Sequence, residues 1–246
     1  MSVRGRLGLG PSQFRITPAA MFFALGELGL SLVWLLAPEE ARTTMVEWVS
    51  ASPSTVFERG HVWTLATSPF LEPNFLGIIL HMVVLWSFVP TLERFWGTTR
   101  FVRFVAITSL VGTVVGTLMG HFVTGMDVPI TGLNAFIDAS LVAFGITYAR
   151  QPVQFFGVLP LTGRQLMYGF IGFLVLSTVL QQAWETGAAS AAAMATAALM
   201  TSKWSPMLAW KRRKIAKARA KLSVMQGGVT GPTKPKPKKP DERFLN

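Results

Sequence analysis

The sequence contains long apolar runs, and their length constrains the fold more than any other feature. The first run, 18–37, reads PAAMFFALGELGLSLVWLLA, and a helix needs about 20 mostly apolar residues to cross a bilayer. Similar runs occupy 74–92, 101–124, 132–149, 165–183 and 186–202. Charged residues make up 14% of the chain, well below the roughly 25% of soluble globular proteins. We therefore expect an all-α, multi-pass integral membrane protein with six transmembrane helices.

The last run, 186–202, is rich in alanine and is the least apolar of the six. Membrane insertion favours Leu and Ile far more than Ala, but small residues let helix backbones approach closely inside a bundle. We therefore expect this helix to span the membrane while packed against its neighbours. The same reasoning predicts a packing ridge on the third helix at Gly112, Gly116 and Gly120. On the fourth helix, the small residues expected to line the packing surface are Gly132, Ala135, Ala139 and Ala143.

The distribution of Lys and Arg predicts the orientation of these helices. If the N-terminus is cytoplasmic, every one of the 23 basic residues except Arg42 and Arg59 lies in a cytoplasmic segment. Cytoplasmic segments of membrane proteins carry an excess of Lys and Arg. The pattern therefore predicts that both termini are cytoplasmic and that 38–73 forms a long external loop. Because no eukaryotic retrieval motif ends the chain, we expect a bacterial cytoplasmic membrane, the cell inner membrane.

The two ends of the chain are expected to lie outside the membrane domain, which spans 18–202. Residues 1–17 form a polar cytoplasmic segment, 203–225 have the pattern of a basic amphipathic helix on the inner leaflet, and 226–246 have the composition of a disordered tail. A solvated helical tail is the alternative for 203–225. The residues expected to contact lipid are Trp204, Trp210, Lys211, Arg212, Arg213 and Lys214. The net charge of +11 therefore predicts anionic lipid as a partner, and no nucleic acid.

The sequence has no cysteine, which excludes disulfides, zinc–thiolate sites and cysteine nucleophiles. Its three histidines, His61, His81 and His121, lie in separate segments, so the chain has no helical zinc motif with paired histidines. From these patterns we expect neither a metal site nor a cofactor.

Several segments, in this order, resemble the rhomboid superfamily: VWTLATSPFLEP, HMVVLWSFVPTLERFWG, a helix with spaced glycines, and GLNAFIDASLVAFG. PVQFFGVLPLTGRQL is similar to the connection between the fourth and fifth helices of that family. The residues that match its loop and second-helix signatures are Trp63, Thr64, Leu92, Glu93 and Gly97. The resemblance covers about residues 55–200 and implies a rhomboid-like bundle of six helices with a long external loop between helices 1 and 2.

The position of the family's serine nucleophile, in a Gly-x-Ser-Gly motif, is occupied by Asn134 in Gly132-Leu133-Asn134-Ala135. A carboxamide cannot be activated as a hydroxyl nucleophile by a neighbouring base. The position of the family's catalytic histidine, on the sixth helix, falls near Ser190, and 183–204 contains no histidine. The resemblance therefore implies a retained fold without protease activity, a pseudoprotease.

Other positions of the family's site are also changed. The position that an oxyanion-stabilising Asn usually holds on the second helix is His81, and Gly77 stands one turn earlier in place of a histidine. In the loop, Trp63-Thr64 replaces a Trp-Arg pair. These departures are similar to those of inactive rhomboids, derlins and Golgi-resident rhomboid-like proteins. Those branches bind transmembrane segments of client proteins in quality control or trafficking, which is the function that the resemblance implies.

Ionisable residues inside a membrane cost at least about 2.5 kcal/mol each and are therefore candidate functional residues. Asp138 lies one helical turn after Asn134, so both point the same way. In the family's arrangement His81 faces the same cavity, and the resemblance therefore implies a polar cluster of all three. Such a cluster either binds a polar group of a client or holds helices 2 and 4 together. Glu27, halfway along the first helix, has no obvious cationic partner.

Two other functions remain open from the residues. The first is an intramembrane serine protease with a relocated dyad, formed by Ser140 or Ser190 with His81. The second is a small transporter or channel that uses Glu27, His81 and Asp138 as an ion path.

Overall fold

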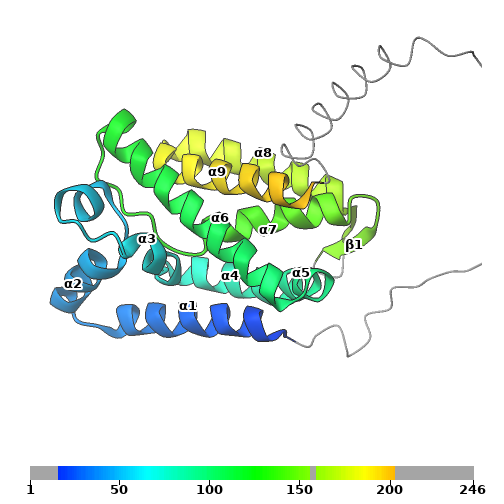
Figure 1. Ribbon diagram of the computed structural model, residues 1–246, viewed down its shortest axis with the longest axis horizontal. Coiled ribbons are helices and arrows are strands. Elements are labelled where there is room, and N and C mark those ends of the chain that lie inside the picture. The colour runs from blue at the N-terminus through cyan, green and yellow to red at the C-terminus, as the bar shows by residue number, and fades with distance from the viewer. Residues whose placement is uncertain (1–15, 156–158, 203–246) are drawn as a thin grey trace, which may run out of the picture. The chain divides into compact units, whose positions relative to one another are not determined.

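The computed structural model describes residues 16–155 and 159–202, and these residues are mostly helical (Figure 1). The long helices are α1 (Pro18–Leu36), α4 (Phe75–Ser87), α5 (Val89–Trp96), α6 (Thr98–Met119), α7 (Asn134–Thr147), α8 (Gly163–Gln181) and α9 (Trp184–Thr201). Each of the six predicted apolar runs therefore contains a helix, with α4 and α5 together covering the second run. A short π-helical turn, η3 (Gly120–Thr124), continues α6.

The segment between α1 and α4 is largely helical, although we expected a long loop there. It contains α2 (Glu39–Val49), η1 (Ser54–Glu58), α3 (Thr64–Thr67) and η2 (Ser68–Phe70). No residue of α2 is fully buried. Ala41, Met45 and Val49 are half-buried at helical spacing, but this stripe is too short to resemble the apolar runs that predicted the other helices. Glu39 and Glu40 in its first turn favour the helix because their charges complement the positive end of the helix dipole.

Four of the helices in the described part of the chain are long and apolar enough to cross a membrane. They are α1, the α4–α5 pair, α6 with η3, and α8. At 14 residues, α7 extends only about 21 Å, less than the roughly 30 Å of a hydrocarbon core. The alanine-rich α9 does not reach the same hydropathy. The protein is thus an all-α membrane protein with four candidate spans, and the six expected spans stay a prediction.

Helix α7 forms the centre of the bundle. Every residue from Ala135 to Gly145 is buried, and the helix contacts α4, α5, α6, α8 and α9. A helix enclosed by protein does not have to match the thickness of the bilayer, because its polar groups are satisfied internally. In Figure 1, α1 and α8 lie on opposite sides of the bundle, with α6 and α7 between them.

Small residues bring α6 and α9 together. The glycine spacing predicted a packing ridge on α6, and the structure shows that α9 is its main partner. A Cβ atom added at Gly112 would lie 2.5 Å from Ala135 Cβ and 3.1 Å from the Ala189 carbonyl oxygen. At Gly116 an added Cβ would lie 3.0 Å from Ala189 Cβ. Gly120 instead contacts Pro53 and the Met126 carbonyl. The first two glycines thus allow close packing of α6 on α9, and the third packs against the segment before η1.

The Gly112→Ala substitution is expected to destabilise the bundle by about 1–3 kcal/mol, because the added methyl group overpacks a site between α6, α7 and α9. Gly169→Ala on α8 is the matched control, since no atom lies within 4 Å of its added Cβ. There the change should stabilise the helix by about 0.5–1 kcal/mol. Thermal unfolding in detergent measures both variants, and equal midpoints for the two would contradict this packing.

An antiparallel hairpin that the sequence patterns did not predict precedes α8. Strands β1 (Pro152–Phe155) and β2 (Leu159–Thr162) pair with Pro152 opposite Thr162. Thr162 then begins α8 with a capping box, in which Thr162 Oγ1 accepts a hydrogen bond from the Gln165 amide and Gln165 Oε1 accepts one from the Thr162 amide. Because Pro and Gly punctuate both short strands, no clear period-2 pattern was visible.

Glu93 on α5 holds the first turn of α1. Its two carboxylate oxygens accept hydrogen bonds from the amides of Ala19, at 3.2 Å, and Ala20, at 3.1 Å. Thr98 Oγ1 donates a third hydrogen bond of 2.8 Å. The first amides of a helix have no partner within it, and an acceptor with negative charge at that end is favourable. Glu93 therefore sets the position of α1 against α5.

Candidate functional site

Four polar side chains from separate segments meet beside α7, and we refer to them as the polar cluster. They are Glu27 on α1, Glu72 in the extended segment before α4, His81 on α4, and Asn134 at the first position of α7. Glu27 is 0% exposed, His81 4% and Glu72 6%. The face of α1 that includes Glu27 is otherwise lined by small residues and Phe23, so the carboxylate is directed into the bundle and away from lipid.

His81 is bonded through both ring nitrogens. Nδ1 contacts Glu27 Oε1, and Nε2 lies 3.0 Å from Asn134 Oδ1. Because an amide oxygen only accepts hydrogen bonds, Nε2 donates to it. The predicted contact between His81 and Asn134 is therefore present, and the partner of Glu27, which the sequence did not identify, is His81. Sequence periodicity could not reveal this pair, since the two residues are 54 positions apart.

Asn134 links His81 to Glu72. Its Nδ2 donates to Glu72 Oε2 at 3.3 Å and to the Thr131 carbonyl at 3.2 Å. Glu72 Oε1 accepts a hydrogen bond of 3.0 Å from the Asn74 amide. The amide of Asn134 thus has its oxygen and its nitrogen in use, and the four residues form a continuous chain of hydrogen bonds from Glu27 to Glu72.

Two glycines provide the space that the Glu72 carboxylate occupies. A Cβ atom at Gly77 would lie 2.7 Å from Glu72 Oε1, and one at Gly132 would collide with Oε2. Gly132 also has a φ of +77°, which side chains with a Cβ rarely adopt. Both glycines were identified as positions of the family's site, but Glu72 was not. The one sequence feature that could have pointed to Glu72 is its place just before a helix that has Gly77 in its first turn.

Burial raises the pKa of the Glu72 carboxyl above its ordinary value, while the hydrogen bond from the Asn74 amide and the nearby His81 act in the opposite direction. The ligand atoms of Glu27, Glu72 and His81 all lie within 4.8 Å of one another. Among the described residues, these three side chains are the group that could hold a metal ion.

Asp138 shares no hydrogen bond with the polar cluster among the described residues, but His81 lies near enough to interact with it electrostatically. Its membership of the cluster therefore stays a prediction. It is 5% exposed, and its polar partner is Ser190 on α9. One turn of helix separates Asp138 from Asn134, but α9 packs against this part of α7 and supplies the nearer hydroxyl. Ala135, next to Asn134, packs against Gly112 of α6. The hydrogen bonds of the site therefore run in two directions, one toward α1 and α4 and one toward α9, with His81 and Asp138 near enough to interact electrostatically.

The remaining signature residues have structural contacts. Leu92 is fully buried, and Gly97 links α5 to α6 with a φ of +81°. Trp63 Nε1 donates to the Trp48 carbonyl at 3.1 Å, and Thr64 Oγ1 donates to the His61 carbonyl at 2.6 Å. These contacts stabilise the region between α1 and α4. The predicted lipid contacts from Trp204 to Lys214, and the segments 1–15 and 203–246, lie outside the described residues.

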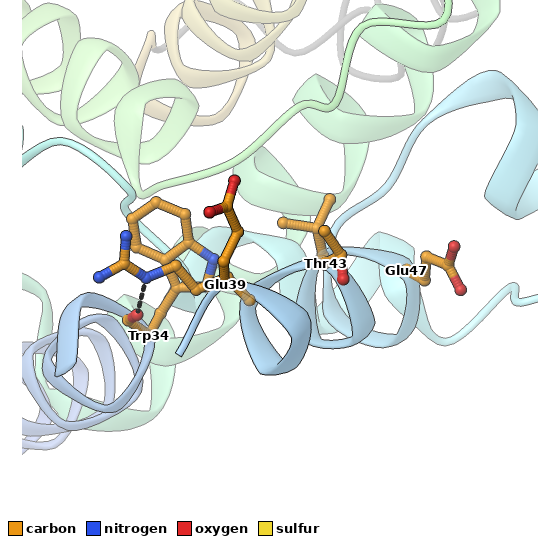
Figure 2. Close-up of a pocket in the computed structure, with 6 residues that line it drawn as sticks. Trp34, Glu39, Thr43 and Glu47 are labelled. Carbon is orange, nitrogen blue, oxygen red and sulfur yellow. Dashed lines mark hydrogen bonds between the residues drawn. The ribbon is translucent and has the colours of Figure 1, made fainter. Parts of the chain in front are cut away.

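A hollow between the end of α1 and α2 is lined by Trp34, Glu39, Arg42, Thr43, Val46 and Glu47 (Figure 2). Arg42 donates to the carbonyls of Trp34, at 3.1 Å, and Leu35, at 2.6 Å. These are carbonyls of the last turn of α1, where a cation is favourable. The principal cation in this hollow therefore caps a helix, and the hollow is separate from the polar cluster.

Residues 21–205 of the chain match the family described as "eukaryotic integral membrane protein (DUF1751)". No curated protein matches the chain. Because the family is described as eukaryotic, it counts against the bacterial cytoplasmic membrane that we expected. That expectation rested on the lack of a retrieval motif, which does not exclude a eukaryotic membrane. The match extends from α1 to the residues after α9. The chain therefore belongs to this family of eukaryotic integral membrane proteins.

Proposed function

We propose that this protein is a non-catalytic, rhomboid-like membrane protein that binds transmembrane segments of client proteins in a eukaryotic membrane. The observation that carries the proposal is the state of Asn134, at the position of the rhomboid nucleophile. Its amide is a structural connector between His81 and Glu72. A group that is bonded on both sides and has no hydroxyl cannot attack a peptide bond.

The geometry gives little support to a relocated protease dyad. Ser140 donates its hydroxyl to the Ile137 carbonyl of its own helix at 2.8 Å, and Ser190 is the partner of Asp138. His81 has both nitrogens bonded to other residues. A nucleophile and its base need to lie within hydrogen-bond reach of each other.

A transporter that uses Glu27, His81 and Asp138 is also less well supported. Glu27 and His81 are in contact, but Asp138 belongs to a different polar contact, with α9. An ion path would have to join these residues along α7, and every residue of α7 from Ala135 to Gly145 is buried in the bundle.

Client binding requires apolar surface that an incoming helix can contact. Helices α4 and α8 both pack on α7 and both expose large apolar side chains. On α4 these include Phe75, Leu76 and Leu80, and on α8 they include Phe173, Leu176 and Leu180. In a membrane such faces contact either lipid or another helix, and helix contacts there depend on packing and interhelical hydrogen bonds. We propose that these two faces receive client helices.

A photo-crosslinking amino acid at Leu80 or Phe173 is expected to capture discrete membrane proteins through their transmembrane segments in eukaryotic cells. Leu25 on α1 is the matched control, since it is exposed to a similar degree, 57% against 54% for Leu80. Equal capture from all three positions would indicate random encounters in the bilayer. Cleavage of a captured segment by the unmodified protein would contradict the non-catalytic assignment.

A further inference from the structure

We propose that Glu27, Glu72 and His81 bind one divalent metal ion, and that the ion is zinc. The site would connect α1, the segment before α4, and α4 itself. It lies inside the bundle, away from the surfaces of α4 and α8 proposed to bind clients, and it does not depend on that function. Nitrogen and carboxylate oxygen are common donors to Zn²⁺ in proteins, and one His with two carboxylates supplies three ligands.

Charge balance is the first argument for a cation. The cluster places two carboxyl groups and one imidazole in the interior of a membrane protein. Within the described residues, the partners of these carboxyl groups are His81, Asn74 and Asn134, and none of them is Lys or Arg. An ionised carboxylate in a medium of low dielectric constant is costly unless a cation neutralises it. A divalent ion neutralises both carboxylates at once.

The bonding of Glu27 is the second argument. Its side chain is 0% exposed, and its Oε2 atom has no hydrogen-bond partner, whereas Oε1 contacts His81. Buried polar atoms are nearly always paired, and an exception asks for a missing partner. A metal ion between Glu27 and His81 supplies that partner.

The orientation of His81 is the third argument. Its Nε2–H donates to Asn134 Oδ1, which leaves Nδ1 directed at the carboxylates. Histidine ligands of metals almost always donate their other ring N–H to an oxygen in this way, which fixes the tautomer and the ring. Asn134 also bonds Glu72 through Nδ2. It is therefore a positioning residue for His81 and Glu72, and Gly77 and Gly132 leave the room that the Glu72 carboxylate occupies.

The test is the zinc content of the full-length protein, purified in detergent without chelators and measured by mass spectrometry of the elements. We expect about one zinc ion per chain, and loss of this zinc in Glu27→Gln, Glu72→Gln and His81→Gln. Matched controls are His121→Gln, at an exposed histidine, and Glu185→Gln, at a buried carboxyl group outside the cluster. Both controls should retain the zinc of the unmodified protein.

A second measurement covers ligand variants that fail to fold. Asn134→Ala keeps all three ligands, and we expect it to bind zinc about 10–100-fold more weakly in a titration against a chromophoric chelator, as outer hydrogen-bond partners of metal ligands do. Adding zinc to the chelated, unmodified protein should raise its unfolding temperature. Two results would overturn the proposal. One is a purified protein that contains no zinc and whose unfolding temperature does not rise when zinc is added. The other is zinc that remains bound in all three ligand variants. Crosslinking from Leu80 and Phe173 tests client binding without reference to zinc. The client-binding proposal and the zinc proposal can therefore fail separately.

Discussion

Replacing His81 with Leu is expected to destabilise the protein by about 3–5 kcal/mol, the cost of removing one member of a buried ion pair. The reason is that Glu27, which is 0% exposed, loses the one hydrogen bond of its carboxyl group. The double variant Glu27→Leu with His81→Leu should be more stable than His81→Leu alone, because no polar group is left without a partner. Unfolding temperatures in detergent with a chelator present measure this difference without a contribution from metal.

The control for this prediction is His121→Leu. His121 is exposed and packs edge-to-face or tilted against Phe122 and Phe57, so its replacement should change stability by no more than about 0.5 kcal/mol. A coupling energy of zero between Glu27 and His81 in the double-mutant cycle would show that the pair does not form.

Replacing Glu93 with Ala is expected to cost at least about 2 kcal/mol, since hydrogen bonds to a charged acceptor contribute roughly 1.5–3 kcal/mol each and three are lost at once. The amides of Ala19 and Ala20 lose their acceptor, and Thr98 loses its own. For a protein of this size the unfolding temperature should fall by about 4–8 °C, at roughly 2–4 °C per kcal/mol.

Glu93→Gln should recover part of this loss, because an amide oxygen can still accept from one of the helix amides without the charge. Glu58→Ala is the control at an exposed acidic residue and should have little effect. If Glu93→Ala unfolded at the same temperature as the unmodified protein, the α1 cap would contribute nothing to the fold. The prediction is independent of the polar cluster, which lies two turns further along α1.

Local patterns predicted the helices well because each one depends on residues that are close in the sequence. The apolar runs marked six helices, and the glycine spacing predicted a close-packing ridge on α6. The same approach missed α2 and the β1–β2 hairpin, since neither segment carries a long apolar run. From hydropathy we also expected α7 to cross the membrane like the other helices, whereas it is a short helix enclosed by protein.

The candidate site was only half predictable. His81 and Asn134 were placed together from a family resemblance, and the structure brings them into contact. Asp138 was placed with them because it lies one turn from Asn134, but α9 provides its partner instead. Glu72 was missed because a single Glu in an extended segment has no periodic neighbour that marks it as buried.

The sequence by itself determined that the chain is an integral membrane protein and where the helices of its six apolar runs lie. These properties follow from residue type and from spacing within one segment. Only the tertiary structure decided that Glu27, Glu72 and His81 share one buried site. Glu93 accepts hydrogen bonds from the first turn of α1, and Glu27 contacts a histidine 54 residues away. Contacts over such distances depend on how helices pack, which no local pattern records.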